Sequence, residues 1–126
     1  MDTSVWIARE VGREIDLSLL PETLFVSVVT LGELQAGVLA AADTATRSQR
    51  LETVSSLAAI QPLPIDETVA AQWAQLRVRL HEAGRRMNVN DLWIAATALV
   101  HHLPVLTQDA DFDVLAEIGA LEIIRV

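Results

Sequence analysis

Asn90-Asp91-Leu92-Trp93-Ile94-Ala95-Ala96-Thr97-Ala98-Leu99 is the stretch that decides the fold, because its apolar residues recur at helical spacing. The spacing predicts a helix with one face packed into the core. We expect Asn90 to be its N-cap and Asp91 to lie in its first turn, beside the positive end of the helix dipole. The small residues in the second half allow a neighbouring sheet to approach closely. Considered alone, Asp91 is most simply interpreted as a residue that stabilises the start of this helix.

The composition indicates one globular domain over residues 1–126. This length allows a sizeable core but not two domains. A hydrophobic content of 52% favours an α/β or all-α fold, and no apolar run is long enough to span a membrane. The N-terminus lacks a signal-peptide pattern. Cysteine is absent, which excludes disulfides, zinc–thiolate sites and a cysteine nucleophile. We therefore expect a cytoplasmic protein without membrane association.

The charge balance narrows the function classes. The net charge is −8, whereas a protein that coats nucleic acid by neutralising its backbone should be basic. A nuclease is not excluded, because the carboxylates of a metal site contribute to the acidity. All 9 basic residues are Arg and none is Lys. A P-loop places a Lys on the nucleotide phosphates, so this absence argues against nucleotide binding of that kind.

Alternating apolar and amphipathic segments predict an α/β fold with a short parallel central sheet and helices on both faces. Apolar runs predict buried strands at residues 24–29, 104–107 and 121–126. Residues 61–65, with two prolines, suit an edge strand or an extended link. Helices are expected at residues 31–40, 47–60, 66–83 and from 114 onward. We expect the first two of these helices to form a hairpin that projects from the sheet.

Capping residues indicate where the helices begin and end. Thr30 as an N-cap with Glu33 three residues later is a capping-box pattern. If this pattern is the whole explanation, Glu33 has no further role. Asp66 is expected to cap the helix over residues 66–83, and Gly84 to end it.

The N-terminal residues resemble the end of a strand that turns into a helix. Asp2 is followed by two hydroxyl residues, and Thr3 or Ser4 is expected to cap that helix. Only Met1 precedes Asp2. We therefore expect either a vestigial first strand or a native start upstream of Met1.

Five acidic residues occupy similar places at the ends of apolar elements. Parallel α/β sheets carry their functional groups at the carboxyl ends of strands, where Asp2, Asp109 and Asp111 are expected. Glu33 and Asp91 are expected in first turns of helices. If the five converge, they raise one another's pKa and need a counter-cation. The motifs contain no His or Cys, which favours Mg²⁺ or Mn²⁺ over zinc. The alternative is a set of unrelated helix caps.

Four segments resemble, in order, the acidic motifs of PIN-domain ribonucleases, and most closely the VapC toxins of bacterial toxin–antitoxin pairs. The segments are Asp2-Thr3-Ser4, Thr30-Leu31-Gly32-Glu33-Leu34, Asn90-Asp91-Leu92-Trp93-Ile94-Ala95-Ala96 and Thr107-Gln108-Asp109-Ala110-Asp111-Phe112. Each motif is weak alone, but four in this order over so short a chain are specific. The resemblance covers nearly the whole chain as a single PIN domain.

The resemblance implies an endoribonuclease that depends on Mg²⁺ or Mn²⁺ and cleaves structured RNA (tRNA, rRNA or mRNA). It also implies a VapB-type antitoxin partner and a homodimer or toxin–antitoxin hetero-oligomer. The metal-site and catalytic positions are Asp2, Glu33, Asp91 and Asp109, with Asp111 as a fifth metal ligand. Supporting roles fall to Thr3, Ser4 and Asn90.

The second half of the helix over residues 66–83 and the residues after it are basic. We expect Arg77, Arg85 and Arg86 to face the RNA; a solvated helix face that complements the C-terminal dipole is the alternative. Two other functions compete with the nuclease. One is a catalytically silent module that binds an antitoxin. The other is an acidic phosphotransfer receiver, which the absence of Lys disfavours.

Overall fold

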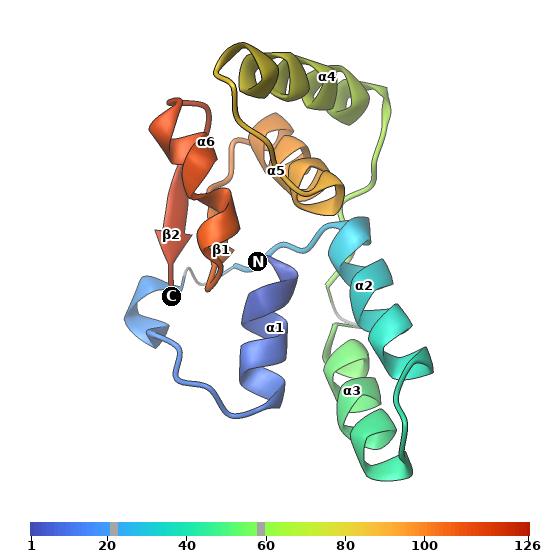
Figure 1. The fold of residues 1–126 in the computed structure, drawn as a ribbon. Helices are drawn as coiled ribbons and strands as arrows, with labels where there is room; N and C mark the ends of the chain where they lie inside the picture. Colours follow the sequence, from blue (N-terminus) through green and yellow to red (C-terminus); the bar gives the residue numbers. More distant parts are fainter. Residues whose placement is uncertain (21–22, 58–59) are drawn as a thin grey trace.

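Helix α5 (Val89–Val100) is the central element of the structure, a computed structural model that describes residues 1–20, 23–57 and 60–126. Figure 1 shows α5 between α4 (Glu67–Glu82), α2 (Val28–Leu39) and the two strands. Its buried residues are Leu92, Ile94, Ala95, Ala96 and Thr97. The prediction of a buried helix that begins near Asp91 is therefore confirmed. Its N-cap is Asn88 and not Asn90, because Asn88 Oδ1 accepts the N–H groups of Asn90 and Asp91.

The strands are short and parallel. β1 (Val105–Thr107) pairs with β2 (Ile123–Arg125), with Val105 opposite Ile123 and Thr107 opposite Arg125. Both strands fall within predicted segments, and the α/β prediction with a parallel sheet is confirmed. The element order continues from β1 through a 3₁₀ turn, η2 (Ala110–Phe112), and α6 (Asp113–Glu117) to β2.

Single hydrogen bonds extend this sheet on the other side of β1. The Asp2 N–H donates to Leu106 O at 2.9 Å, and the Met1 amino group donates to Phe25 O at 2.6 Å. Beyond them, the Leu63 N–H donates to Val26 O at 2.8 Å. Met1 and Asp2 thus lie between the segment at residues 25–28 and strand β1, in the place of a strand.

The predicted strand at residues 24–29 is wrong apart from one bridge between Ser27 and Leu63. The pairing stops at Ser27, because the next residue already belongs to a helix. Helix α2 begins instead at Val28, and Ser27 Oγ accepts the Thr30 N–H at 3.1 Å.

Two further capping predictions are corrected. Thr30 is not an N-cap, because it lies inside the first turn of α2; the capping box with Glu33 therefore does not form. Helix α1 (Thr3–Glu10) is capped by Asp2 and not by Thr3 or Ser4, since the Asp2 carboxylate accepts the Ser4 N–H.

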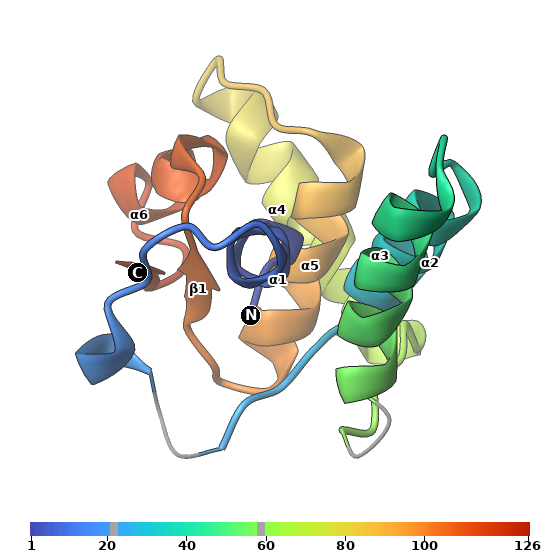
Figure 2. The ribbon, with the colours of Figure 1, turned by 90° about the horizontal axis from the view of Figure 1, so that it is seen from below.

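Helices α2 and α3 (Thr44–Ser56) run side by side, away from the strands, in both views (Figures 1 and 2). This arrangement confirms the predicted helical hairpin. Helix α3 begins before residue 47 because Asp43 Oδ1 accepts the Thr46 N–H at 2.7 Å. It ends at Ser56, before the predicted end at residue 60; residues 58–59 of that prediction lie outside the described residues.

Helix α4 follows the prediction closely. Asp66 Oδ1 accepts the Val69 N–H at 2.9 Å, and Gly84 ends the helix with a φ of +67°, a conformation that favours glycine. A further 3₁₀ turn, η1 (Leu17–Leu19), lies in the connection after α1. Among the described helices, none combines the length and apolar character needed to cross a membrane.

The core has two parts. The larger joins α4, α5, β1 and the segment from Phe112 to Leu115, and it is centred on the buried face of α5. The smaller packs Trp6 of α1 against Leu34 of α2 and Leu57 after α3. Helix α1 therefore contacts the α2–α3 hairpin on one side while its N-terminus meets β1 on the other.

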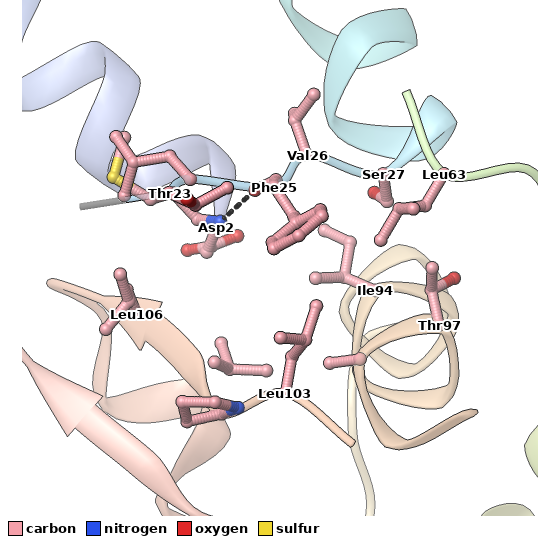
Figure 3. A pocket seen from close by; sticks show the side chains of 15 residues that line it. Asp2, Thr23, Phe25, Val26, Ser27, Leu63, Ile94, Thr97, Leu103 and Leu106 are labelled. Carbon is pink, nitrogen blue, oxygen red and sulfur yellow. Dashed lines mark hydrogen bonds between the residues drawn. The ribbon is translucent and has the colours of Figure 1, made fainter. Parts of the chain in front are cut away.

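An apolar pocket lies beside the start of the chain. Figure 3 shows Phe25, Val26, Ile94, Thr97 and Leu103 around it. Of the five predicted site carboxylates, only that of Asp2 belongs to its lining. This pocket is therefore a packing gap next to the short first segment and not the place where the carboxylates meet.

The close packing of α5 can be tested at two alanines. Ala96 is 0% exposed in the larger core, whereas Ala98 lines the apolar pocket. We expect Ala96→Leu to lower the free energy of unfolding by about 1–3 kcal/mol through overpacking. Ala98→Leu is the control, because it adds the same atoms beside the apolar pocket. It should lower the free energy of unfolding by less than Ala96→Leu does. Urea unfolding measures both; an equal loss at the two positions would contradict this account of the core.

Candidate active site

Asp91 lies in the first turn of α5 and is half-buried. Its pKa is raised from 3.8 to about 7. Burial is the largest cause, followed by the negative charges of Asp2, Glu33, Asp111 and Asp109. The four other acidic residues predicted from the sequence are therefore close enough to act on Asp91, although they come from three other parts of the chain.

Asp2 is held at the junction of α1 and β1. It is 3% exposed, and its Oδ2 accepts hydrogen bonds from Ser4 Oγ at 2.7 Å and from Thr107 Oγ1 at 2.9 Å. The Ser4 N–H donates to the same oxygen at 3.3 Å. These donors stabilise a carboxylate that is almost fully removed from water.

Glu33 reaches the site from the second turn of α2. Its Oε1 accepts a hydrogen bond of 2.6 Å from Thr3 Oγ1, in the first turn of α1. Thr3 also lies 3.4 Å from Thr30 Oγ1, and Ser27 Oγ lies 3.3 Å from the same hydroxyl. A chain of hydroxyl groups thus joins the N-terminal ends of α1 and α2, which fixes Glu33 relative to Asp2.

Asp109 and Asp111 follow strand β1. Asp109 is the N-cap of η2, and its Oδ1 accepts the Asp111 N–H at 3.4 Å. The Asp109 N–H itself donates to Thr107 Oγ1 at 2.9 Å. Asp109 is half-buried and Asp111 is exposed, so the two side chains differ in their access to solvent. The next acid, Asp113, forms an ion pair with Arg125 at 3.2 Å instead.

Three of the residues that organise the site were missed from the sequence. Thr107 and Thr30 are both fully buried hydroxyl residues, and Asn88 caps α5. A signal existed for Thr107, because it is the polar residue that ends an otherwise apolar strand. Asn90, which the resemblance gives a supporting role, is exposed, and its side chain makes no hydrogen bond within the described residues.

A basic pocket adjoins the start of α5. Its lining includes Arg77, His81, Arg85 and Arg86 together with Val89, which lies two residues before Asp91. The Arg77 guanidinium lies over the Trp73 ring at 5.3 Å. Arg85 forms an exposed ion pair with Glu117 at 2.6 Å. The three arginines predicted to face a substrate thus line one pocket, whose lining includes none of the five site carboxylates.

The donor set fits a hard divalent cation. The converging ligands are carboxylate oxygens, which Mg²⁺ and Mn²⁺ prefer. Within the described ranges, no three His, Asp or Glu side chains are arranged to hold one ion between them. Mg²⁺ usually keeps several waters and binds through one or two carboxylates, so a hydrated ion does not require three side chains on one centre.

Comparison with known proteins identifies the family. The model of the PIN domain matches residues 1–118. The chain is 53% identical to Ribonuclease VapC5 of Mycobacterium tuberculosis over 126 residues, which is 100% of this chain and 93% of that protein. It is 41% identical to Ribonuclease VapC4 of the same species over 122 residues, covering 97% and 94% of the two chains.

Solved structures agree with this result. The crystal structure of VapBC-5 from Mycobacterium tuberculosis superposes with a TM-score of 0.91 at 51% identity, covering 99% of this chain and 95% of that chain. FitAcB from Neisseria gonorrhoeae gives a TM-score of 0.74 at 31% identity, covering 98% and 94%. The match to the family model and the full-length relatives together show that this chain belongs to the PIN domain family.

Proposed function

We propose that this protein is an endoribonuclease toxin that depends on Mg²⁺ or Mn²⁺ and is neutralised by a VapB-type antitoxin. The observation that carries the proposal is the place of Asp91 at the start of α5, where partial burial and then the charges of four other acids (Asp2, Glu33, Asp111 and Asp109) raise its pKa to about 7. Such a cluster is electrostatically unfavourable without a cation. Relatives named as VapC ribonucleases supply the reaction class.

Asp2, Glu33, Asp91 and Asp109, with Asp111 at the exposed edge, would hold the hydrated cation, one or two of them directly and the others through its waters. A divalent cation bound there would supply charge neutralisation at the scissile phosphate and activation of water. The carboxylates orient water for in-line attack on phosphorus. The water oxygen bonds to phosphorus and releases a proton, the bond from phosphorus to the leaving oxygen breaks, and the leaving oxygen takes up a proton. No covalent nucleophile is needed.

The basic pocket at the end of α4 binds the RNA. Arg77, Arg85 and Arg86 there offset the acidic site and contact phosphates. Structured RNA in the cytoplasm (tRNA, rRNA or mRNA) is the substrate class. Because Arg85 already pairs with Glu117, it exchanges that exposed partner for phosphate.

A VapB-type antitoxin is the protein partner. The structures similar to this one include VapBC-5, a member of a toxin–antitoxin family, which supports a toxin–antitoxin hetero-oligomer or a toxin homodimer. An Arg side chain from the antitoxin that enters the carboxylate cluster would form charge-assisted hydrogen bonds there. Such a contact explains inhibition by charge neutralisation.

The pH dependence of stability tests the carboxylate cluster. Since the pKa of Asp91 rises from 3.8 to about 7 on folding, the folded state binds the proton more tightly. In EDTA, the free energy of unfolding should therefore fall as pH rises between these values. Asp91→Asn should lack this loss, and saturating Mn²⁺ should restore stability at pH 8 in the wild type only. Urea unfolding across pH 4–8 measures this; identical profiles for the two proteins would refute the coupling.

Loss of cleavage in Asp91→Asn tests the reaction. We expect cleavage to fall about 100-fold or more, the size of losing one preorganised electrostatic contributor, with the fold retained. Asp113→Asn is the matched control, because Asp113 pairs with Arg125 outside the cluster. Cleavage of total cellular RNA with Mn²⁺ is the assay. Full activity in a folded Asp91→Asn variant would leave the silent interaction module as the better explanation.

Arg77→Gln tests the RNA surface. We expect weaker RNA binding. The slope of the binding constant against salt concentration, on logarithmic axes, should fall by the amount that corresponds to about one lost phosphate contact. Arg9→Gln is the control, since Arg9 lies over the Trp6 ring at the same 5.3 Å but on α1. Binding of labelled tRNA across a salt series, with Ca²⁺ in place of Mn²⁺, measures the effect. If both variants weaken binding equally, the basic pocket is not the RNA site.

A further inference from the structure

Two hydroxyl groups from distant parts of the chain converge on one oxygen of a buried carboxylate. Ser4 Oγ and Thr107 Oγ1 donate to Asp2 Oδ2 at 2.7 and 2.9 Å, and the Ser4 N–H donates to it at 3.3 Å. Asp2 Oδ1 accepts no hydrogen bond from the described residues. The two oxygens of Asp2 are therefore in different environments.

Each hydroxyl also accepts a backbone N–H from the segment that follows β1. The Gln108 N–H donates to Ser4 Oγ at 3.0 Å, and the Asp109 N–H donates to Thr107 Oγ1 at 2.9 Å. Each hydroxyl has one hydrogen to donate, and the charged Asp2 carboxylate is the strongest acceptor within reach of both, which favours donation by both to Asp2 Oδ2. The 3.1 Å approach of the two hydroxyl oxygens follows from their sharing one acceptor.

We propose that Thr107 is a positioning residue that acts with Ser4 to occupy Asp2 Oδ2 and to present Oδ1 to the divalent cation. This inference rests on the proposed function. The same hydroxyl fixes the backbone of Asp109, so two metal-site carboxylates share one support. Partners of this kind set ligand orientation and affect metal affinity strongly.

Burial makes this support hard to replace. Asp2 is 3% exposed and Thr107 is 0% exposed, so water cannot take the place of a lost hydroxyl without a local rearrangement. Removing the hydroxyl leaves Asp2 Oδ2 short of one donor and leaves the Asp109 N–H without an acceptor. Both carboxylates then lose their fixed orientation while the apolar packing of the strand is kept.

Thr97 provides a matched control. It is 1% exposed, and its hydroxyl donates to Trp93 O at 2.8 Å, one turn back in α5. Thr→Val at position 97 therefore removes a buried, hydrogen-bonded hydroxyl that does not contact a site carboxylate. Any effect of Thr→Val that is specific to position 107 comes from its place beside Asp2 and Asp109.

The test measures Mn²⁺ affinity by calorimetry for the wild type, Thr107→Val, Thr107→Ser and Thr97→Val, with thermal unfolding in EDTA alongside. We expect Thr107→Val to bind Mn²⁺ about 10-fold or more weakly. Thr107→Ser should rescue the affinity to near the wild-type value, since it keeps the hydroxyl. Thr97→Val should keep wild-type affinity even where its melting temperature falls as far as that of Thr107→Val.

The outcomes separate this inference from the proposed function. If the folded wild type binds no Mn²⁺, the metal-dependent function fails and the inference falls with it. If the wild type binds and Thr107→Val binds equally well, or Thr107→Ser is as weak as Thr107→Val, only the inference is overturned. If Thr107→Val does not fold, Ser4→Ala removes the other donor to the same oxygen; weakened Mn²⁺ binding supports the inference and unchanged binding overturns it.

Discussion

Mutual repulsion among carboxylates at the start of α5 is the constraint on which this structure depends. The fold places Asp91 among four other acids and buries it partly, which raises its pKa to about 7. Electrostatic repulsion alone would move these negative charges apart. They stay together because α5 is packed into the larger core and because hydroxyl groups hold Asp2 and Glu33 in place. Core packing therefore supports an unfavourable charge arrangement.

Backbone hydrogen bonds of the parallel sheet hold the acidic residues in place only to a small extent. Among the described residues, only β1 and β2 form a ladder, and the other extended segments are joined by one or two hydrogen bonds each. Where strand pairing ends, side-chain hydroxyl groups form the hydrogen bonds between elements. The contact between Ser4 and Thr107 connects α1 to β1, and the hydrogen bond from Thr3 to Glu33 connects α1 to α2. These contacts lie at the carboxyl end of β1, next to the acidic residues. The site and the interior of the fold are thus held by the same residues.

Much of this arrangement could be predicted from the sequence, because buried helix faces and strands place apolar residues at regular intervals along the chain. The helical spacing around Asp91, the Asp66 cap and the apolar runs before Thr107 and at the C-terminus all correspond to observed elements. The failures occurred where local patterns competed. The run at residues 24–29 has the pattern of a strand, but α2 begins at Val28 after a single bridge, so no ladder forms. Spacing could not reveal which hydroxyl touches which oxygen, since that depends on contacts between residues about 100 positions apart.

The charge distribution connects the proposed RNA cleavage with its inhibition by an antitoxin. RNA carries a dense negative charge, and this chain has a net charge of −8, so the substrate and the site repel each other at long range. A divalent cation between the carboxylates and the phosphate removes that repulsion where the bond is cleaved, and the arginines beside α5 do so along the backbone. An Arg from an antitoxin could satisfy the same carboxylates without supplying a reactive water. In the proposed function, the electrostatic demand for a metal in the free enzyme is thus also the basis of its inhibition by a basic side chain.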